Sequence, residues 1–170
     1  MNSYNIVTAK EMNIKIGIGY DVHQLAEGYE FWLGGIKIEN PKGAVGHSDA
    51  DVLIHAICDA LLGAANLRDI GYHFSDTSSE FKGIDSKILL KRVIKLLKEK
   101  EYTVGNIDSI IILQKPKVQQ FIEQMKETLA AVMEIDPDNI SIKATTTEKL
   151  GFTGREEGIA AQAVALIEKK

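Results

Sequence analysis

Hydrophobic and polar residues alternate regularly near the start of the chain, over residues 14–20 (Ile-Lys-Ile-Gly-Ile-Gly-Tyr). Successive side chains of a β-strand point to opposite faces, so this pattern predicts a strand with its three isoleucines on one face. We expect the strand to end in Asp21-Val22-His23 and a loop to follow over residues 24–29. Asp21 and His23 would then share one face of the strand end, and Val22 would point to the other.

The middle of the chain alternates between strands and three substantial helices. Gly34-Gly35 separates two short apolar runs and predicts a hairpin. An almost entirely apolar helix is expected to begin with Ser48 or Asp49 as its N-cap and to run to Ala65. The other predicted elements are a helix from Asp85-Ser86 to about Lys100, a strand over 102–114, a helix over 118–133 and a strand over 140–145.

The last segment, residues 158–167, fits two structures. Its many alanines favour a helix, whereas alternation of Ile159, Ala161, Ala163, Ala165 and Ile167 fits a strand. In either case strands and helices are interleaved, which predicts an α/β (α+β) two-layer sandwich of one mixed sheet packed against about three helices. We expect a single domain over residues 14–170, preceded by a short, disordered leader over residues 1–13.

Composition narrows the class of protein. The chain has 170 residues, 45% of them hydrophobic and 26% charged, which is typical of one globular domain with a real core. A formal net charge of −4 gives no basic field that would attract nucleic acid or an anionic membrane surface. No run approaches the ~20 apolar residues of a membrane span. The single cysteine, Cys58, excludes an internal disulfide and favours a reducing compartment, so we expect a cytoplasmic protein.

Candidate metal ligands occur in two places. Asp21 and His23 offer a carboxylate oxygen and an imidazole nitrogen to one point, which is two thirds of a catalytic zinc site. Asp51, His55 and Asp59 are spaced i, i+4, i+8 and lie on one face of the apolar helix. These groups either hydrogen-bond to one another or His55 binds a metal while an aspartate orients its other nitrogen. Asp21, His23 and His55 together would make a complete three-ligand site.

Two further stretches suggest phosphate chemistry, each with a simpler alternative. His47 precedes the apolar helix, where it could meet an anion near helix N–H groups or serve as a surface histidine of the capping region. Thr145, Thr146 and Thr147 offer hydroxyls to phosphate oxygens and Glu148 could hold a hard cation, although threonines are also common at strand ends. The long polar loop over residues 66–83 is of a kind that is usually functional or mobile.

Taken together, these motifs resemble the 2-C-methyl-D-erythritol 2,4-cyclodiphosphate synthase family over residues 14–170. The motifs are Gly-Tyr-Asp-Val-His (19–23), Gly-His-Ser-Asp-Ala-Asp-Val (46–52), Ala-Leu-Leu-Gly-Ala-Ala (60–65), Asp-Ile-Gly (69–71), Phe-Ser-Asp-Thr (74–77) and Lys-Ala-Thr-Thr-Thr-Glu-Lys-Leu-Gly-Phe-Thr-Gly-Arg (143–155). They occur in the family's order and spacing, so the resemblance is specific. It also favours the strand for residues 158–167.

The resemblance implies an enzyme of the non-mevalonate isoprenoid pathway. Such an enzyme converts 4-diphosphocytidyl-2-C-methyl-D-erythritol 2-phosphate to the cyclic diphosphate and releases CMP, by attack of the 2-phosphate on the β-phosphate. The family's sheets pack around a threefold axis in a homotrimer, with active sites between subunits. Isoprenoid diphosphates have been proposed to bind in its central cavity.

The resemblance also assigns roles to residues of this chain. Zn²⁺ is expected on Asp21, His23 and His55, and Mg²⁺ or Mn²⁺ on Glu148. His47 and Thr146 match catalytic positions that stabilise the transition state. The expected substrate contacts are Asp21, Val22, His23, His47, Ser48, Asp69, Ile70, Gly71, Phe74, Ser75, Asp76, Thr77, Ser78, Leu113, Gln114, Lys115, Pro116, Lys117, Val118, Gln119, Thr145, Thr146, Thr147, Glu148, Phe152 and Arg155. Among these, Phe74 to Ser78 match a flexible covering loop, and Leu113 to Gln119 with Thr145 to Glu148 match the cytidine and diphosphate pocket.

A few features depart from the family or leave alternatives open. The leader is extra, and many members have proline where Ser75 stands. Asp51 and Asp59 are expected to support the zinc ligands. The alternative enzyme is a metal-dependent hydrolase or phosphotransferase acting on another nucleotide diphosphate. The alternative from another class is a trimeric protein that binds an isoprenoid diphosphate without catalysis.

Overall fold

A computed structural model describes residues 13–75 and 83–169 of the chain. The expected leader, apart from Asn13, lies outside the described residues. So do three members of the expected covering loop, Asp76, Thr77 and Ser78.

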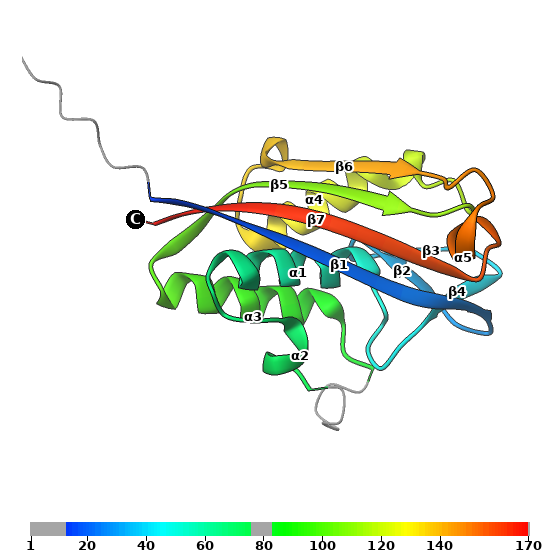
Figure 1. Cartoon of the computed structure of the whole chain (residues 1–170), viewed down its shortest axis with the longest axis horizontal. Coiled ribbons are helices and arrows are strands. Elements are labelled where there is room, and N and C mark those ends of the chain that lie inside the picture. The colour runs from blue at the N-terminus through cyan, green and yellow to red at the C-terminus, as the bar shows by residue number, and fades with distance from the viewer. Residues whose placement is uncertain (1–12, 76–82, 170) are drawn as a thin grey trace, which may run out of the picture.

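A five-stranded mixed sheet forms one layer of the molecule (Figure 1). Its strands, in spatial order, are β4 (Lys42–Val45), β1 (Ile14–Glu27), β7 (Gly158–Lys169), β5 (Tyr102–Ile112) and β6 (Ile140–Thr145). Only β5 and β6 run parallel, and the other neighbours are antiparallel. The short strands β2 (Phe31–Leu33) and β3 (Ile36–Ile38) form the predicted hairpin around Gly34-Gly35.

Three helices form the second layer and cover one face of the sheet (Figure 1). They are α1 (Val52–Ala64), α3 (Ser86–Glu99) and α4 (Ile122–Met133). Shorter helical segments are α2 (Ile70–His73), η2 (Gln119–Phe121), η3 (Pro137–Asn139) and α5 (Gly151–Gly154). This arrangement confirms the two-layer sandwich. Among the described residues, no helix is long and apolar enough to cross a membrane.

The C-terminal segment is a strand, as its alternation indicated. In β7 the side chains at odd positions from Ile159 to Ile167 are buried, whereas Gln162 and Val164 are exposed. Ala161, Ala163 and Ala165 belong to this buried face, and α1 packs on β7, where small side chains let a helix approach a sheet closely. Helix propensity was therefore the misleading signal here, because packing decides the structure of this segment.

The first strand is longer than predicted. The expected loop over residues 24–29 is wrong for residues 24–27, which continue β1 and pair with β4 from Gln24–Val45 to Glu27–Lys42. The chain turns only after Glu27, at Gly28, whose φ is +84°. Asp21 and His23 therefore lie within β1 rather than at its end. Both pair with β7 on one side, and on the other side the end of β4 begins to pair with β1 at the next residue, Gln24.

Helix α1 lies almost directly on the backbone of β1. A methyl group added at Gly19 would lie 1.9 Å from the Ala56 carbonyl oxygen, and one at Gly17 would lie 2.0 Å from that of Ala60. Only glycine permits so close an approach of strand and helix. Because Gly17 and Gly19 share their strand face with Asp21 and His23, the same contact brings the next ligand, His55 of α1, to that face.

Candidate metal centre and substrate pockets

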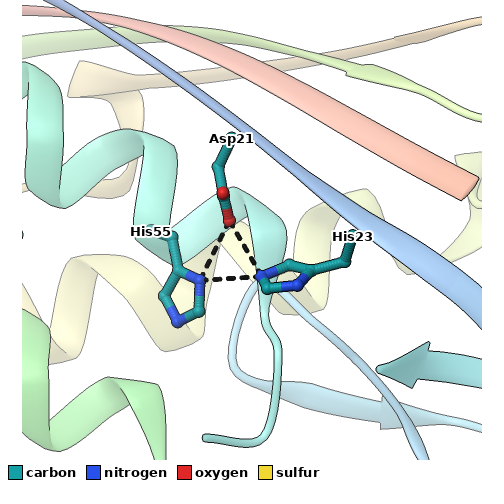
Figure 2. A group of neighbouring side chains, drawn as sticks. All are labelled: Asp21, His23 and His55. Carbon is teal, nitrogen blue, oxygen red and sulfur yellow. Dashed lines mark hydrogen bonds and ion pairs between the residues drawn. The ribbon is translucent and has the colours of Figure 1, made fainter. Parts of the chain in front are cut away.

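Asp21, His23 and His55 converge on one point between β1 and α1 (Figure 2). Asp21 Oδ2 lies 3.0 Å from His23 Nε2 and 2.9 Å from His55 Nδ1. The two ring nitrogens are 3.1 Å apart. One carboxylate oxygen and two imidazole nitrogens are a donor set that suits a divalent metal and leaves a fourth position open.

The hydrogen bond that His23 makes through Nδ1 determines the tautomer of its ring. His23 Nδ1 lies 3.0 Å from the carbonyl oxygen of Val45, the last residue of β4. A carbonyl oxygen only accepts hydrogen bonds, so Nδ1 carries a proton. In the neutral ring Nε2 therefore has a lone pair, which faces Asp21. Such a bond fixes both the tautomer and the ring orientation of a metal-binding histidine.

The charges of the cluster also favour a cation. Burial opposes ionisation of Asp21, but the hydrogen bonds and positive charge that the His23 and His55 rings supply when they are protonated outweigh it. They hold the pKa of its carboxyl well below its usual range. For His23, burial favours the neutral ring, whereas the bond to Asp21 and its negative charge raise the pKa overall. An ionised carboxylate beside two ring nitrogens attracts a proton or a metal ion to the same point. The three residues fit a divalent metal on these grounds.

Asp51 does not orient His55, contrary to expectation. It is the N-cap of α1, in place of Ser48 or Asp49, and its side chain accepts a hydrogen bond from the Ile54 N–H. Its two oxygens also accept from the N–H groups of Gly34 (2.9 Å) and Gly35 (2.6 Å). Burial raises the pKa of Asp51 although these three bonds oppose the shift. Asp51 therefore joins the hairpin turn to the start of α1.

Asp59 likewise does not contact the histidine cluster through a hydrogen bond of its own side chain. Its Oδ1 accepts from the N–H of Ile70 at 2.7 Å, at the first residue of α2. Asp69 is the N-cap of this short helix and accepts from Tyr72 N–H at 2.9 Å. Asp59 thus holds the Asp69-Ile70-Gly71 segment against α1, one helical turn beyond His55.

The second nitrogen of His55 is met by two serines, one of which the sequence did not suggest. His55 Nε2 lies 3.0 Å from Ser86 Oγ and 3.2 Å from Ser48 Oγ. Ser86 begins α3 and is fully buried, and its hydroxyl donates a short hydrogen bond to Asp49. Sequence reasoning treated Ser86 and Asp49 only as helix caps, and no spacing rule connects either residue to His55.

Most of the expected contacts to the methylerythritol part of the substrate gather beside the histidines. A cavity of about 320 Å³ is lined by His23, His47, Ser48, His55, Ile70, Gly71, Phe74, Ile84 and Leu89. Val22 departs from this group because its side chain points to the opposite face of β1, where it is exposed. Ser75 is the last residue described before the gap.

The expected nucleotide contacts gather elsewhere in the chain. A cavity of about 760 Å³ is lined by Leu25, Asn40, Pro41, Lys42, Gln114, Lys115, Pro116, Lys117, Thr146, Glu148 and Glu156. An adjoining cavity of about 310 Å³ adds Leu113, Val118, Gln119 and Thr145. Thr146 Oγ1 donates to Glu148 Oε1 at 2.8 Å, and Thr147 Oγ1 lies 2.9 Å from Thr153 Oγ1. No residue lines both this region and the histidine cavity in the described part of the chain.

Two expected contacts, Phe152 and Arg155, lie in and just after α5. Arg155 makes a two-pronged ion pair with Glu157, at 2.9 Å for both contacts. Phe152 packs close to Gly158, where an added methyl group would lie 2.9 Å from its ring. Both residues are exposed in the single chain, at the end of the sheet where β7 begins.

The fold and the cluster define a class of protein: a mixed α/β sandwich with a three-ligand candidate metal centre facing an open cavity. Within this class, the model of the YgbB family matches residues 14–168. The chain belongs to the YgbB family, which confirms the predicted membership.

Several relatives agree with this assignment. The chain is 66% identical over 158 residues to the 2-C-methyl-D-erythritol 2,4-cyclodiphosphate synthase of Bacteroides thetaiotaomicron, covering 93% of this chain and 99% of that protein. Its fold matches the bifunctional IspDF from Campylobacter jejuni with a TM-score of 0.91 and 39% identity, over 94% of this chain and 43% of that longer one. It also matches IspF of Plasmodium falciparum in a CDP complex, with a TM-score of 0.82 and 35% identity, over 93% and 97% of the two chains.

Proposed function

We propose that this chain converts 4-diphosphocytidyl-2-C-methyl-D-erythritol 2-phosphate to 2-C-methyl-D-erythritol 2,4-cyclodiphosphate and CMP. The observation that carries the proposal is the convergence of Asp21, His23 and His55 within 4.8 Å in a chain that is 66% identical to a synthase of that name. The protein of Plasmodium falciparum with the same fold is described in complex with CDP, which supports a cytidine nucleotide as the leaving part.

The proposed reaction exchanges one phosphorus–oxygen bond for another within one molecule. An oxygen of the 2-phosphate forms a bond to the β-phosphorus, the bond from that phosphorus to the CMP oxygen breaks, and CMP leaves with the electron pair. The nucleophile is already an anion, so the protein need not supply a general base. The enzyme is therefore a cyclising, CMP-releasing phosphorus–oxygen lyase that works by folding the substrate for in-line attack and stabilising crowded negative charge.

The donor set supports zinc as the metal of the histidine cluster. Two imidazoles and one carboxylate match the three-ligand pattern of catalytic zinc sites, in which one position stays open. When bound, Zn²⁺ supplies positive charge to a phosphate oxygen as a Lewis acid and template. Asp21, His23 and His55 would hold it. Glu148, with oxygen donors of Thr146 beside it, suits a harder cation such as Mg²⁺ or Mn²⁺ on the diphosphate.

The remaining residues are assigned by their match to the family's motifs and by the two cavities. His47 and Thr146 would stabilise the transition state, and Ser48 would bind substrate beside His47. The segment Asp69-Ile70-Gly71 would bind the methylerythritol hydroxyls, with Phe74 to Ser78 covering them. Leu113 to Gln119 and Thr145 to Glu148 would hold cytidine and diphosphate.

A homotrimer with active sites between subunits explains why the two groups of contacts occupy separate cavities. Glu148 and the histidine cluster must act on one substrate, and a neighbouring subunit can supply the second group. An exposed apolar face of the sheet supports this assembly, since Ile16 is 69% and Ile18 64% exposed in the single chain. Phe152 and Arg155 would then face a central cavity with room for an isoprenoid diphosphate. We place the enzyme in the cytoplasm, in agreement with its single reduced cysteine.

The test of this function follows both products at once. Purified protein is incubated with the cytidyl substrate, Zn²⁺ and Mg²⁺, and CMP and cyclic diphosphate are measured by phosphorus NMR. We expect both products in equal amounts from the wild type and none above background from His55→Ala. Prior treatment with a strong chelator should abolish turnover, and Zn²⁺ with Mg²⁺ should restore it.

His73→Ala is the matched control for His55→Ala. His73 is also partly buried, but its ring bonds to the Leu67 carbonyl oxygen at 2.8 Å rather than to the cluster, so cyclic product should persist. CMP with only linear phosphates would show a hydrolase acting on the nucleotide diphosphate. Tight binding of an isoprenoid diphosphate, with no turnover of the cytidyl substrate whichever metal ion is added, would support a trimeric binding protein. Either result would overturn the proposal.

A further inference from the structure

A chain of hydrogen bonds leads from the candidate metal centre into the protein. His55 Nε2 lies 3.0 Å from Ser86 Oγ, and the same hydroxyl makes a short hydrogen bond to Asp49 Oδ1. The Ser86 N–H also donates to Asp49 Oδ2 at 2.9 Å. The three residues come from different segments: His55 from α1, Ser86 from the start of α3 and Asp49 from the loop before α1.

The direction of these bonds follows from the inventory of protons. Asp49 accepts from the Ser86 N–H, the Ser86 hydroxyl and the Asp51 N–H, which is the pattern of a carboxylate that only accepts. Ser86 has one hydroxyl proton, and it is donated in the hydrogen bond to Asp49. Towards His55 the Ser86 oxygen can then only accept, so His55 Nε2 must carry a proton.

This direction leaves the other ring nitrogen bare. His55 Nδ1 points at Asp21 Oδ2, 2.9 Å away. In the opposite tautomer Nδ1–H would donate to Asp21, and that bond would occupy both a ring nitrogen and a carboxylate oxygen that a metal needs. The two tautomers therefore compete, and the Asp49–Ser86 pair favours the one that can bind a metal.

Ser48 cannot make this choice by itself. Its oxygen lies 3.2 Å from His55 Nε2 and accepts from the Ala50 N–H at 3.1 Å. The Ser48 hydroxyl proton has no carboxylate in the described contacts to hold it, so it can rotate to donate to Nε2 or turn away. Ser86 differs because Asp49 fixes where its proton goes.

We propose that Asp49 and Ser86 are positioning residues that hold His55 in the Nε2–H tautomer, so that Nδ1 is ready to ligate the metal. The inference rests on the metal centre of the proposed function and adds two residues to it. The pair is well anchored: Asp49 N–H donates to the Ile84 carbonyl at 3.1 Å, and Gly83 N–H donates to the His47 carbonyl at 2.7 Å. These bonds join the loop before α1 to the segment that enters α3.

The first measurement determines which nitrogen of the His55 ring carries the proton. Nitrogen-15 NMR of the metal-free wild type distinguishes a protonated from a bare ring nitrogen, and loss of signals in His55→Ala assigns the ring. We expect Nε2 of His55 to be protonated and Nδ1 bare. In Ser86→Ala the Nδ1–H form should appear. A wild-type His55 protonated mainly on Nδ1 would overturn the proposal.

The second measurement is Zn²⁺ affinity, by competition with a chelator of known affinity. Loss of a hydrogen bond that supports a metal ligand costs roughly 10- to 100-fold in affinity, and we expect a loss in this range for Ser86→Ala. Asp49→Asn keeps the shape of the side chain but replaces one oxygen with an NH₂ group. This NH₂ group either faces the Ser86 N–H, where two donors oppose each other, or donates to Ser86 Oγ and reverses the direction of the hydrogen bond between the two side chains. The Zn²⁺ affinity of Asp49→Asn should fall by a similar factor.

Two comparisons separate positioning from damage to the fold. Ser109→Ala is the matched control, since Ser109 is also buried and its hydroxyl donates to the Ser141 carbonyl at 2.9 Å, away from the metal centre. It should bind Zn²⁺ like the wild type. The double variant Asp49→Asn/Ser86→Ala should bind no more weakly than the weaker single variant, because without Ser86 the carboxylate cannot reach His55.

Wild-type affinity in both single variants, or additive losses in the double variant, would overturn the proposal. Failure of the proposed function gives a different result. A wild type that shows Nε2–H on His55 but binds no Zn²⁺ would mean that the hydrogen-bond chain is correct and the metal centre is wrong.

Discussion

The two faces of β1 differ sharply in what determines them. The inner face carries Gly17, Gly19, Asp21 and His23, and it lies against α1 and the metal centre. The outer face carries Ile16, Ile18, Tyr20 and Val22, all exposed in the single chain. One strand thus presents its smallest and most polar residues to the interior and its largest apolar residues to the outside.

This inversion separates what one chain needs from what an assembly needs. On the inner face, backbone-to-backbone contact with α1 leaves room only for glycine, and the ligands are placed by that contact. On the outer face no described element of the chain covers the isoleucines, although contiguous exposed apolar patches usually mark an interaction surface. Inner-face changes should therefore act on folding and metal binding, and outer-face changes on association.

The largest effect should come from Gly19→Val on the inner face. The new Cβ would lie 1.9 Å from the Ala56 carbonyl oxygen and 2.7 Å from the Ala60 nitrogen, and these backbone atoms move only if α1 moves. We expect the free energy of unfolding to fall by about 3 kcal/mol or more, and Zn²⁺ binding to be lost because His55 moves with α1. Urea unfolding and a Zn²⁺ titration measure the two effects.

Gly63→Ala provides the control for this substitution. Gly63 lies in α1 itself, where an added methyl group would meet the Ile18 carbonyl oxygen only at 3.9 Å, an ordinary contact. Alanine in place of a helical glycine should raise the free energy of unfolding by about 0.5–1 kcal/mol. A stable, metal-binding Gly19→Val protein would show that the inner face is not set by this contact.

The sequence predicted much of the inner face because local spacing determines it. Asp21 and His23 share a face through the two-residue repeat of a strand, and His55 joins them through a helix whose apolar character marks it as buried. Ser86 and Asp49 lie 37 positions apart and Ser86 lies 31 positions from His55. Only the packed fold brings them together, so no local pattern could indicate their role.

Other differences between prediction and structure have the same origin. Gln24 to Glu27 look like a loop in the sequence because they lack β-branched residues, yet pairing with β4 extends the strand through them. Alternation over residues 14–20 shows that β1 has two faces but not which one is covered. Large isoleucines suggest an interior, whereas in the chain the glycine face lies inside because α1 requires close contact.

The next largest effect is expected from Ile18→Asp on the outer face, and it should fall on the assembly of subunits rather than on the folding of the single chain. Ile18 is 64% exposed, so the single chain should fold and bind Zn²⁺ with little change. In a trimer the carboxylate would be buried without a partner, at a cost on the order of several kcal/mol per subunit. We expect sedimentation velocity to show monomers, and cyclodiphosphate formation to fall to background because the nucleotide pocket of a neighbour is missing.

Ile88→Asp is the matched control for the outer face. Ile88 is 46% exposed on α3, in the other layer of the molecule, so this variant should assemble and turn over substrate like the wild type. An Ile18→Asp protein that stays trimeric would instead place the subunit interface on another surface. Full activity of monomeric Ile18→Asp would contradict an active site shared between subunits.

The smallest effect, and the finest test of the outer face, is expected from Val164→Thr in β7. Val164 pairs with Ile18 across the sheet, is 39% exposed and nearly matches threonine in shape. In dissociated chains the substitution should change the free energy of unfolding by no more than about 0.5 kcal/mol. In the proposed trimer the hydroxyl would be buried against apolar groups, at a cost of about 1–3 kcal/mol if it finds no acceptor. Urea unfolding at low and high protein concentration should therefore show a difference from the wild type that grows with concentration. The same difference at every concentration would mean that Val164 stays exposed to water in the assembly, and that only the β1 half of the outer face forms the interface.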